Sequence, residues 1–521
     1  MCFAATMCFL LPFPLFLVTL FLLSLFKSSK NSPMTESKLP PSPPRLPIIG
    51  NLHQLGRLHH QNLWKLSQQH GPIMLLKLGT VPTLVVSSSH YAKQILKQHD
   101  ISFCSRPSSP GTKRLFYNCS DVAFSPYGDH WRNARKVFVG SLMSGKRAEF
   151  FARAREIEIG GFVDYLSAVE TNPIDLDEMI FDVIGGIVGR VAFGKSYRWK
   201  EFEGKKLKGV MDEAMQVISS FSAEDFFPFF GRFVDLVSGH KARLENCFRT
   251  IDGFYEMILN EHFNRRDGCR EDGDEEEEEE DFVDVLIGLL REKNGLLQSK
   301  EHLKALLMNT FLGGVDTSAI ILVWAMCELI RNPLVMKKVQ REIRWKLARK
   351  TRVEANDIDD LTYTKMVVKE VLRLHPPAPF LVPRECMRTC KISGENGEVY
   401  DVYPKTRVLV NAWAIGRDPN KWRNPHEFCP ERFEGNDVDF RGQHFEFLPF
   451  GGGRRICPGI SNALATVELT LANLLYWFNW EVPKGMELED VASLEEEGGI
   501  TVHKRTHLTL VPIKYSFETC P

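Results

Sequence analysis

The sequence lacks an excess of charge of either sign. Its 521 residues include 65 Lys and Arg against 66 Asp and Glu, whereas proteins that bind nucleic acid usually carry a basic surplus. The 12 cysteines lack the paired spacing of small disulfide-bonded domains, and Cys386 and Cys390 lack the second pair that a zinc site needs. We therefore expect no nucleic-acid partner, no disulfide framework and no zinc site, and we interpret these cysteines as reduced thiols.

The chain also lacks an internal linker beyond residue 50. A length of 521 residues would accommodate about three domains of ~150 residues, but no stretch is rich enough in Gly, Ser or Pro to mark a boundary between them. We therefore expect one large domain over residues 51–521. The eight consecutive acids Asp274–Asp281 are predicted to be a solvated, mobile loop without a catalytic role, because like charges repel one another.

Charge is missing altogether from the first 26 residues. The apolar run Cys8–Phe26, as a helix, would span roughly 28 Å, close to the ~30 Å hydrocarbon core of a bilayer. A cleaved signal peptide is the alternative, but it would place basic residues before the run, and Lys27 and Lys30 follow it. Residues 1–27 are therefore predicted to be a single transmembrane anchor, with the lysine side and the rest of the chain in the cytosol.

The segment 28–50 is predicted to be a hinge because it contains the proline-dense run Leu39–Pro47. Such a run forms a semi-rigid extended spacer, and a ligand for a proline-recognition module is the alternative. If the domain that follows is cytosolic, the sequon Asn118-Cys119-Ser120 does not meet the glycosylation machinery and carries no information.

Helical patterns predominate in the rest of the chain, with short strands between them. Apolar spacing predicts helices over much of 148–263, over Glu301–Arg331 and from about Ser461 to Trp477. Ile73–Leu78 and Thr83–Ser87, separated by Gly79 and Pro82, predict a hairpin, and Thr406–Asn411 predicts a further strand. The segment from Arg106 to Phe124 is rich in Ser, Pro and Gly and is predicted to be irregular.

The most informative stretch is Leu448–Gly459, which ends an irregular segment and precedes the last long helix. Three consecutive glycines allow a backbone with φ > 0 to lie flat against a bulky group. Cys457 follows Arg454 and Arg455 at the helix N-terminus, where the dipole and the charges favour the thiolate, the form that ligates metal. A soft sulfur ligand on a flat backbone suits iron held in a macrocycle; a free buried cysteine is the alternative.

The pattern Phe450-x-x-Gly453-x-Arg455-x-Cys457-x-Gly459 matches the haem-binding signature of the cytochrome P-450 superfamily, and the chain resembles that family. The resemblance implies a mainly α fold with small β-sheets, in which one large haem domain follows the N-terminal membrane anchor. It implies haem b as cofactor and Cys457 as the iron ligand. The other residues of the loop that it implies to contact the haem are Arg455, Phe450, Gly451 and Gly459.

Three further residues are implied to bind the haem. Trp131 and Arg135 are four apart in a predicted helix and share a face; without the cysteine motif, solvated helix residues would be the interpretation. They resemble the family's Trp-x-x-x-Arg, which contacts the haem propionates, and Arg384 by its place in the pattern is another propionate partner. Two buried carboxylates need such cations, because an unpaired charge in an apolar site is costly.

The centre of the predicted helix Glu301–Arg331 breaks the rules of a buried helix. It is apolar on most faces, yet it contains Gly313, Gly314 and the acid Asp316 followed by Thr317. A kink with Asp316 in a structural salt bridge is the alternative. The stretch resembles the family's oxygen-activating motif, which implies that the glycine makes room for oxygen while Asp316 and Thr317 relay protons to it. Gly313 stands where alanine is commoner in the family.

A second pair of motifs is implied to be structural. Glu370 and Arg373 lie three apart near a helix end, a pair that is ordinarily worth only tenths of a kcal/mol. In the family this Glu-x-x-Arg meets the arginine of a Pro-Glu-Arg-Phe segment, which is Pro430–Phe433 here. Glu370, Arg373 and Arg432 are therefore expected to form a triad that holds the cysteine loop.

The resemblance also implies which segments surround the substrate. These are the loop Arg106–Phe124, the segment Ala378–Val382 beside the haem edge, the turn Gly498–Val502 and, as a hypothesis with core packing as its equal alternative, a cluster of phenylalanines. The cluster comprises Phe221, Phe226, Phe227, Phe229 and Phe230. In the family, this region often also contacts membrane.

The implied function is a haem-thiolate monooxygenase that inserts one atom of O2 into a small apolar substrate. The chain has no Gly-x-Gly-x-x-Gly after a strand and no flavin-like region, so electrons are expected to come from NADPH through a separate reductase, NADPH-cytochrome P-450 reductase in the family. Arg132, Lys136 and Arg454 are the hypothesised docking face for it. The motifs resemble the plant microsomal branch, which implies an endoplasmic reticulum membrane protein with a cytosolic catalytic domain.

Two alternative functions keep the haem. A haem-thiolate dehydratase or isomerase would work without a reductase, and a haem-binding sensor or carrier would not need the Asp316–Thr317 pair; the intact pair favours the monooxygenase. The sequence does not identify the substrate. Terpenoid, alkaloid, phenylpropanoid and aldoxime compounds all remain open.

Overall fold

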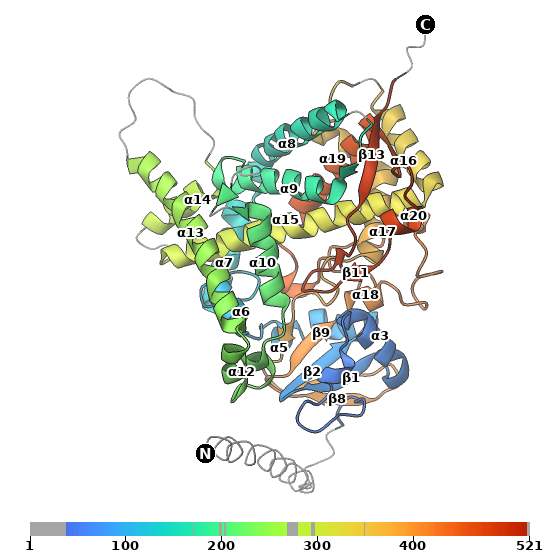
Figure 1. Ribbon diagram of the computed structural model, residues 1–521. Coiled ribbons are helices and arrows are strands. Elements are labelled where there is room, and N and C mark those ends of the chain that lie inside the picture. Colours follow the sequence, from blue (N-terminus) through green and yellow to red (C-terminus); the bar gives the residue numbers. More distant parts are fainter. Residues whose placement is uncertain are drawn as a thin grey trace, which may run out of the picture.

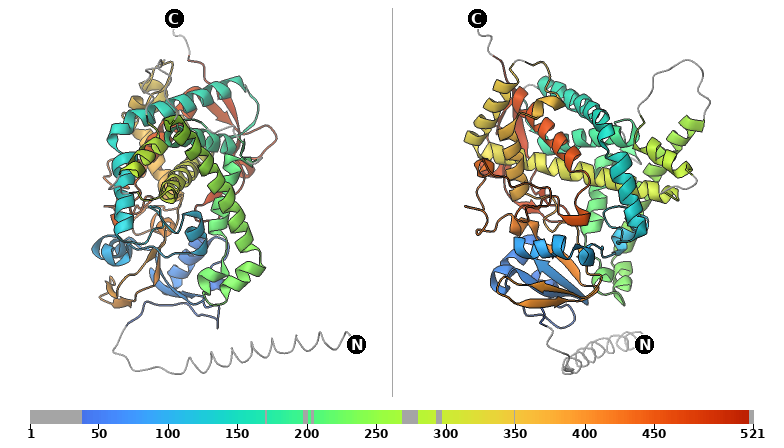
Figure 2. Two further views of the ribbon diagram at one scale, coloured as in Figure 1. Left: turned by 90° about the vertical axis from the view of Figure 1, so that its left-hand side faces the viewer. Right: turned by 180° about the vertical axis from the view of Figure 1, so that it is seen from behind.

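The computed structural model describes residues 38–517, apart from 170, 197–200, 203–204, 268–279, 293–296 and 349. The predicted anchor at 1–27, the first part of the hinge and most of the acidic run Asp274–Asp281 lie outside these residues. Within them, helices fill most of the molecule, and a four-stranded sheet lies at one end (Figures 1 and 2). This confirms the predicted mainly α fold with small β-sheets.

The helices of the described chain are the following. They are α3 (His59–His70), α4 (Ser89–Lys93), α5 (Asp100–Phe103), α6 (Pro110–Leu115), α7 (Asp129–Val137), α8 (Ala148–Ala168), α9 (Leu176–Phe193), α10 (Leu207–Ser219), α11 (Ala223–Phe226), α12 (Gly231–Val237), α13 (His240–Asp267), α14 (Phe282–Arg291), α15 (Lys300–Arg331), α16 (Pro333–Lys346), α17 (Thr362–Leu374), α18 (Ala412–Ile415), α19 (Ile460–Trp477) and α20 (Leu488–Val491). The predicted helical region 148–263 is confirmed, and the predicted last long helix begins one residue early, at Ile460.

Helix α15 forms the centre of the fold. It crosses the middle of the molecule, with α9, α17 and α19 packed against it (Figure 1). The helix is apolar on most faces because it is surrounded by protein, and its predicted extent is confirmed to within one residue. In the described part of the chain it is the one helix long and apolar enough to cross a membrane, but 78% of its most apolar window is buried in the protein. It is therefore the core helix of the domain.

The four-stranded sheet has the order β1-β2-β9-β6. Its strands are β1 (Ile73–Leu78), β2 (Val81–Val86), β9 (Arg407–Val410) and β6 (Arg384–Glu385). The predicted hairpin is antiparallel with Ile73 opposite Val86, and β9 runs parallel to β2 with Arg407 opposite Thr83. The predicted second strand, Thr83–Ser87, is displaced, since β2 starts two residues earlier; the predicted strand Thr406–Asn411 is confirmed as β9.

The remaining strands form small sheets near the chain end and the surface. They are β3 (Ile174–Asp175), β4 (Glu201–Phe202), β5 (Lys205–Lys206), β7 (Cys390–Ser393), β8 (Val399–Val402), β10 (Phe478–Glu481), β11 (Glu496–Glu497), β12 (His503–Lys504) and β13 (Thr509–Lys514). The hairpin β11–β12 encloses the predicted pocket turn Gly498–Val502 and contacts the central helix.

The segment Arg106–Phe124 is not irregular throughout, as the sequence pattern predicted. It contains α6, whose first turn is closed by a capping box between Ser109 and Thr112 with Pro110 at the first helical position. The prediction was wrong here because the Ser, Pro and Gly that mark loops also initiate helices.

Candidate functional site

Cys457 lies on a loop that is fixed on both sides. Its backbone N–H donates to the carbonyl of Phe450 at 3.1 Å. Helix α19 begins three residues after Cys457, at Ile460, with Gly459 as its N-cap. Gly453 has φ +67°, and a Cβ there would lie 2.2 Å from the carbonyl oxygen of Leu96. Only glycine therefore lets the loop pack against the segment before α5.

The neighbours of Cys457 favour the thiolate, as predicted, but burial of the thiol acts against them. Burial raises its pKa, and the opposing effects, a hydrogen bond from the Gly459 N–H and the charge of Arg135, are weaker. Arg454 is more than half exposed, and the Arg455 guanidinium points to backbone carbonyls instead. The thiolate must therefore come from a bound metal cation, which deprotonates a coordinating thiol.

A cavity of about 360 Å³ separates Cys457 from the central helix α15. Eight of the predicted site residues line it: Cys457, Arg455, Arg135, Arg384, Phe450, Gly451, Gly459 and Thr317. Trp131 and Asp316 are not among the described residues that form its wall. The predicted site is thus assembled around one cavity, with these two side chains behind it.

Three arginines at this cavity have no carboxylate partner. Arg455 donates to the carbonyls of Cys104, Val122 and Ser125, and Arg135 donates to that of Ile456 at 2.7 Å. Arg106 donates to backbone carbonyls of Ala123, Val382 and Pro383. None of the three forms an ion pair with an acidic residue in the described ranges. The protein therefore satisfies their hydrogen bonds without giving any of them an ion-pair partner, and the buried Asp121 acts on Arg106 and Arg455 only through its charge.

The lack of an ion-pair partner is reflected in the pKa values of the three arginines. Burial lowers the pKa of Arg455 to about 9, with the charges of Arg384 and Arg135 acting in the same direction, and burial also lowers the pKa of Arg106 and of Arg135. Buried cations are costly without a counter-charge. An acidic group in the cavity would supply it, so the site fits a ligand that has an iron centre for Cys457 and carboxylates for these arginines, as haem has.

The other two predicted propionate partners have contacts within the protein. Arg384 forms an ion pair with Asp100 at 2.8 Å and donates to the carbonyl of Gly452. The Trp131 indole N–H donates to the carbonyl of Val122 at 3.1 Å, and its ring lies 4.1 Å from the Arg455 guanidinium. Trp131 thus supports Arg455, and its own contact with the haem stays a prediction.

Arg106 is a site residue that sequence reasoning missed. It lines the cavity and is buried, yet a single arginine in a polar loop is by default solvated, and no partner at helical spacing distinguishes it. The only available signal was its place at the start of the loop predicted to cover the haem.

The opposite wall of the cavity is the middle of α15. Thr317 Oγ1 donates to the carbonyl of Gly313 at 2.6 Å, and a Cβ on Gly313 would have no neighbour within 4 Å. The helix is continuous through the glycines. Gly313 therefore leaves open space beside the Thr317 hydroxyl, as oxygen binding requires.

Asp316 is buried and lines a second, smaller cavity that shares Met215 and Leu312 with the large one. Its Oδ1 is 3.1 Å from Nε2 of His503, so the salt bridge that the sequence suggested as an alternative role does exist. No sequence pattern indicated this partner, because His503 lies on a strand almost two hundred residues further along the chain.

The predicted triad is brought together. Arg373 Nε donates to Glu370 Oε2 and Arg432 Nε donates to Glu370 Oε1, each at 2.8 Å. Glu370 and Arg373 are fully buried, and Arg373 also donates to the carbonyls of Gly416 and Pro425 at 2.7 Å. The three residues join α17 to the segment that precedes the cysteine loop.

Three of the four predicted segments contribute to the cavity wall, and α9 and α10, which were not predicted to line it, contribute as well. Phe116 and Phe124 contribute from the loop after Arg106, Leu381 from the Ala378–Val382 segment, and Ile500 and Thr501 from the turn in β11–β12. The phenylalanine cluster is not in the wall. Phe229 is 99% exposed and Phe230 52%, whereas Phe227 packs against Gly79.

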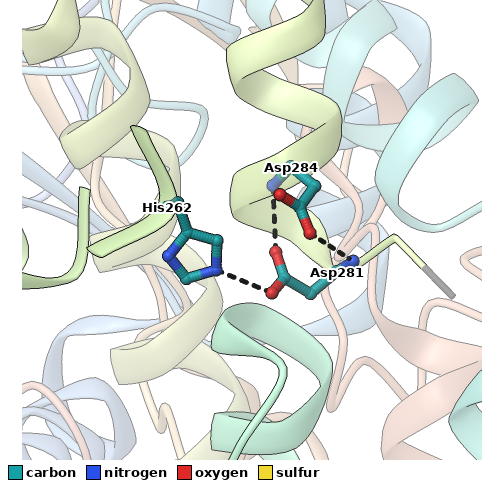
Figure 3. A group of neighbouring side chains, drawn as sticks. All are labelled: His262, Asp281 and Asp284. Atoms are coloured by element: carbon teal, nitrogen blue, oxygen red, sulfur yellow. Dashed lines mark hydrogen bonds and ion pairs between the residues drawn. The ribbon is translucent and has the colours of Figure 1, made fainter. Parts of the chain in front are cut away.

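The cluster of His262, Asp281 and Asp284 has the residue types of a metal site (Figure 3). Both ring nitrogens of His262 face acceptors, the carbonyl of Ile258 and Asp281 Oδ2, each at 2.8 Å. Burial alone would lower the pKa of His262, but Asp281 outweighs it and raises the pKa. The imidazole therefore donates from both nitrogens as a cation, which does not ligate metal.

The two aspartates of this cluster close the start of α14. Asp281 accepts from the backbone N–H of Asp284 at 2.9 Å, and the Asp284 carboxylate binds Arg265 at 2.8 Å. The cluster is thus a helix N-cap with its own two cations.

Comparison with known proteins agrees with this site. The family model Cytochrome P450 matches residues 40–510. Parthenolide synthase of Tanacetum parthenium is 48% identical over 487 residues, 93% of each chain, and 4-hydroxyphenylacetaldehyde oxime monooxygenase of Sorghum bicolor is 47% identical over 519 residues, 98% of this chain and 95% of that one. A zebra fish cytochrome P450 solved with abiraterone has a TM-score of 0.72 at 26% identity, covering 89% of this chain and all of that one. The chain therefore belongs to the cytochrome P450 family and is a monooxygenase of its plant branch.

Proposed function

We propose that the protein inserts one oxygen atom from O2 into a C–H or C=C bond of a small apolar specialised metabolite, while two electrons from NADPH and two protons from solvent convert the other atom to water. The observation that carries this is the placement of Cys457 and Thr317 on opposite walls of one cavity, between arginines that lack a counter-charge. When bound, haem supplies the redox chemistry, and a thiolate ligand favours O–O cleavage.

The chain's own residues provide three things in this reaction. Arg455 and Arg135 neutralise the acidic groups of the cofactor, Gly313 leaves space for oxygen, and Thr317 and Asp316 deliver protons to it. The apolar walls exclude bulk water, which strengthens the electrostatic interactions inside.

The substrate is proposed to be a terpenoid or an aldoxime with a largely apolar body. Two polar side chains in the cavity wall are already engaged: Asn309 accepts from the N–H groups of Val122 and Ala123, and Thr310 donates to the carbonyl of Leu306. Shape therefore holds the substrate more than hydrogen bonds do. Parthenolide synthase and the Sorghum oxime monooxygenase, both about equally similar to this chain, motivate the two classes.

One end of the molecule is proposed to contact membrane lipid. The exposed apolar residues Phe229, Phe233 and Val237 lie on and before α12, at the same end as the four-stranded sheet (Figure 1). Hydrogen bonds of Gly79 to the Ile49 carbonyl and of Thr80 to the Phe226 carbonyl connect this surface with an exposed apolar turn at Leu46–Ile49. This supports attachment to the endoplasmic reticulum membrane by the 1–27 anchor with the catalytic domain on the cytosolic face.

Electrons are proposed to come from NADPH-cytochrome P-450 reductase. Arg132, Lys136 and Arg454 are all exposed on the side of the cysteine loop, where an acidic partner surface would approach Cys457. Reversing these charges to Glu should lower reductase-supported turnover and leave the haem spectrum intact; unchanged turnover would remove this docking face.

The assignment of Cys457 has a direct spectroscopic test. Cys457→Ser should abolish the thiolate-type spectrum of the reduced carbonyl complex, whereas the matched variant Cys429→Ser, a partly exposed cysteine of another loop, should keep it. Persistence of the spectrum in Cys457→Ser would show that Cys457 is not the iron ligand. Product formation without NADPH or reductase would favour a dehydratase or isomerase, and binding without substrate-dependent NADPH consumption would favour a sensor or carrier.

A further inference from the structure

Asp316 contacts a residue that the proposed function leaves without a role. His503 lies on β12, and its Nε2 is the ion-pair partner of Asp316 Oδ1 at 3.1 Å. The contact is tertiary, since the β11–β12 hairpin packs on the middle of α15. Over the described ranges no other basic side chain pairs with Asp316.

The two oxygens of the Asp316 carboxylate have different surroundings. Oδ1 binds His503, whereas Oδ2 is buried and has no hydrogen-bond partner within the described chain. Asp316 lines a small cavity that has about 40 Å³ of room for water. About 10–15 Å³ suffices for one water molecule. Met215 and Leu312 form the wall between this small cavity and the large one that Thr317 lines.

His503 connects this buried carboxylate to the surface. Its side chain is 33% exposed and that of Asp316 only 9%. The imidazole stacks on Phe181 with the ring centroids 5.8 Å apart, which holds Nε2 towards Asp316. The other titratable groups around it are Lys208 and Asp212 of α10, which pair with each other, Asp182 of α9, and Glu497 and Lys504 of its own hairpin.

The protonation state of His503 depends on Asp316. Burial alone would lower the pKa of His503, but the charge of Asp316 and the hydrogen bond to it outweigh burial and raise the pKa above its ordinary value. Near neutral pH, His503 is therefore protonated more often than a free histidine and can still release the proton.

We propose that His503 transfers protons from solvent to Asp316 during oxygen activation, a role that rests on the proposed function. His503 Nε2 gives its proton to Asp316 Oδ1, and the neutral carboxyl group turns and delivers that proton towards Thr317. The neutral imidazole then takes a replacement from solvent. Each passage through this relay moves one proton inward and restores both side chains, so one turnover needs two passages. His503 acts through Asp316, so it is a positioning residue.

The first test does not depend on activity. The rate of hydrogen–deuterium exchange at the imidazole Cε1, followed by mass spectrometry against pH in the full-length protein, gives the pKa of His503. In Asp316→Asn we expect the midpoint to fall by about one unit or more, because the opposite charge is removed. An unchanged midpoint would overturn the proposal.

The second test measures coupling with reductase and NADPH. The Gln side chain of His503→Gln can still donate to Asp316 but does not exchange a proton. The variant should lower product per NADPH roughly tenfold, less than the ~10²–10⁴-fold contribution of a group that acts directly on the reacting atoms, and should raise the solvent isotope effect. Wild-type coupling should fall as pH rises through the His503 pKa, and this dependence should vanish in His503→Gln.

His507→Gln is the matched control, because His507 pairs with Asp175 on the surface at 2.6 Å, away from the cavity; it should behave as wild type. Wild-type coupling and pH dependence in His503→Gln would contradict the role of His503 alone. If Asp316→Asn and Thr317→Ala also remain fully coupled, the proposed function of that pair fails as well.

Discussion

Arg373 and Arg455 are both buried guanidinium groups near the cysteine loop, but their charges are balanced in different ways. Arg373 faces Glu370 at 2.8 Å, and Arg432 shares the same carboxylate. Arg455 has three backbone carbonyls and no carboxylate among the described residues, and its pKa is lowered to about 9.

The difference separates what holds the fold from what binds the cofactor. A buried cation with its own anion is complete in the protein alone, so its loss destabilises the chain itself. A buried cation satisfied only by carbonyls still favours an added anion, so its loss should be felt mainly when the acidic ligand binds. Buried arginines of both kinds have their hydrogen bonds satisfied, and only the presence of a carboxylate partner distinguishes them.

The largest effect is expected for Arg373→Met. Removing one member leaves Glu370 buried beside Arg432 alone, which should lower the free energy of unfolding by about 3–5 kcal/mol, measured by denaturant unfolding of the protein in detergent. The double variant Glu370→Gln with Arg373→Met should recover part of the loss because no unpaired carboxylate remains. A loss below about 1 kcal/mol in the single variant would show that Arg373 is not needed as the counter-charge of the buried Glu370.

The pH dependence of stability tests a buried carboxylate that has its own positively charged partners, Glu496. Burial alone would raise the pKa of Glu496, but the hydrogen bond from His60 and the charges of His60, His375 and Arg417 lower it to about 2. The carboxylate therefore contributes stability that is complete above pH 4.5 and is lost as the pH falls towards 2. Melting temperatures between pH 6 and pH 3 should fall less steeply in Glu496→Gln; an identical slope would refute this.

Arg135→Gln tests the uncompensated set. Gln can still donate to the carbonyl of Ile456, so the protein without haem should lose less than about 1 kcal/mol. Haem affinity should fall about tenfold, since a charge-assisted hydrogen bond is worth roughly 1.5–3 kcal/mol. The rate of haem transfer to excess apomyoglobin measures it. Equal haem retention in wild type and variant would show that Arg135 does not serve the cofactor.

The smallest effect is expected at an exposed pair. Arg505 and Glu495 lie 2.9 Å apart with about half of each side chain in solvent. Arg505→Ala should change the free energy of unfolding by less than about 1 kcal/mol, and by less still at high salt. A loss of stability as large as that of Arg373→Met would contradict the expectation that an exposed ion pair contributes little.

Spacing along one element was predictable from the sequence. The pairs Trp131/Arg135 and Glu370/Arg373 are local, and Leu448–Gly459 is one continuous loop, so their residue types and intervals indicate the chemistry directly. The phenylalanine cluster shows the limit of this approach: the sequence pattern does not distinguish pocket wall from exposed surface, and Phe229 is on the surface. The effect of burial on the Cys457 thiol was not predictable for the same reason, because burial depends on neighbours distant in sequence.

The sequence by itself therefore determined the buried central helix and the family, and it predicted the metal ligand. Each of these depends on side chains within one turn or one loop. The tertiary structure alone decided which cations have a partner, that Arg106 belongs to the cavity, and that His503 meets Asp316. Those contacts join segments far apart in the chain, and the counter-charge of a buried group is set by whatever the fold places within a few ångströms of it.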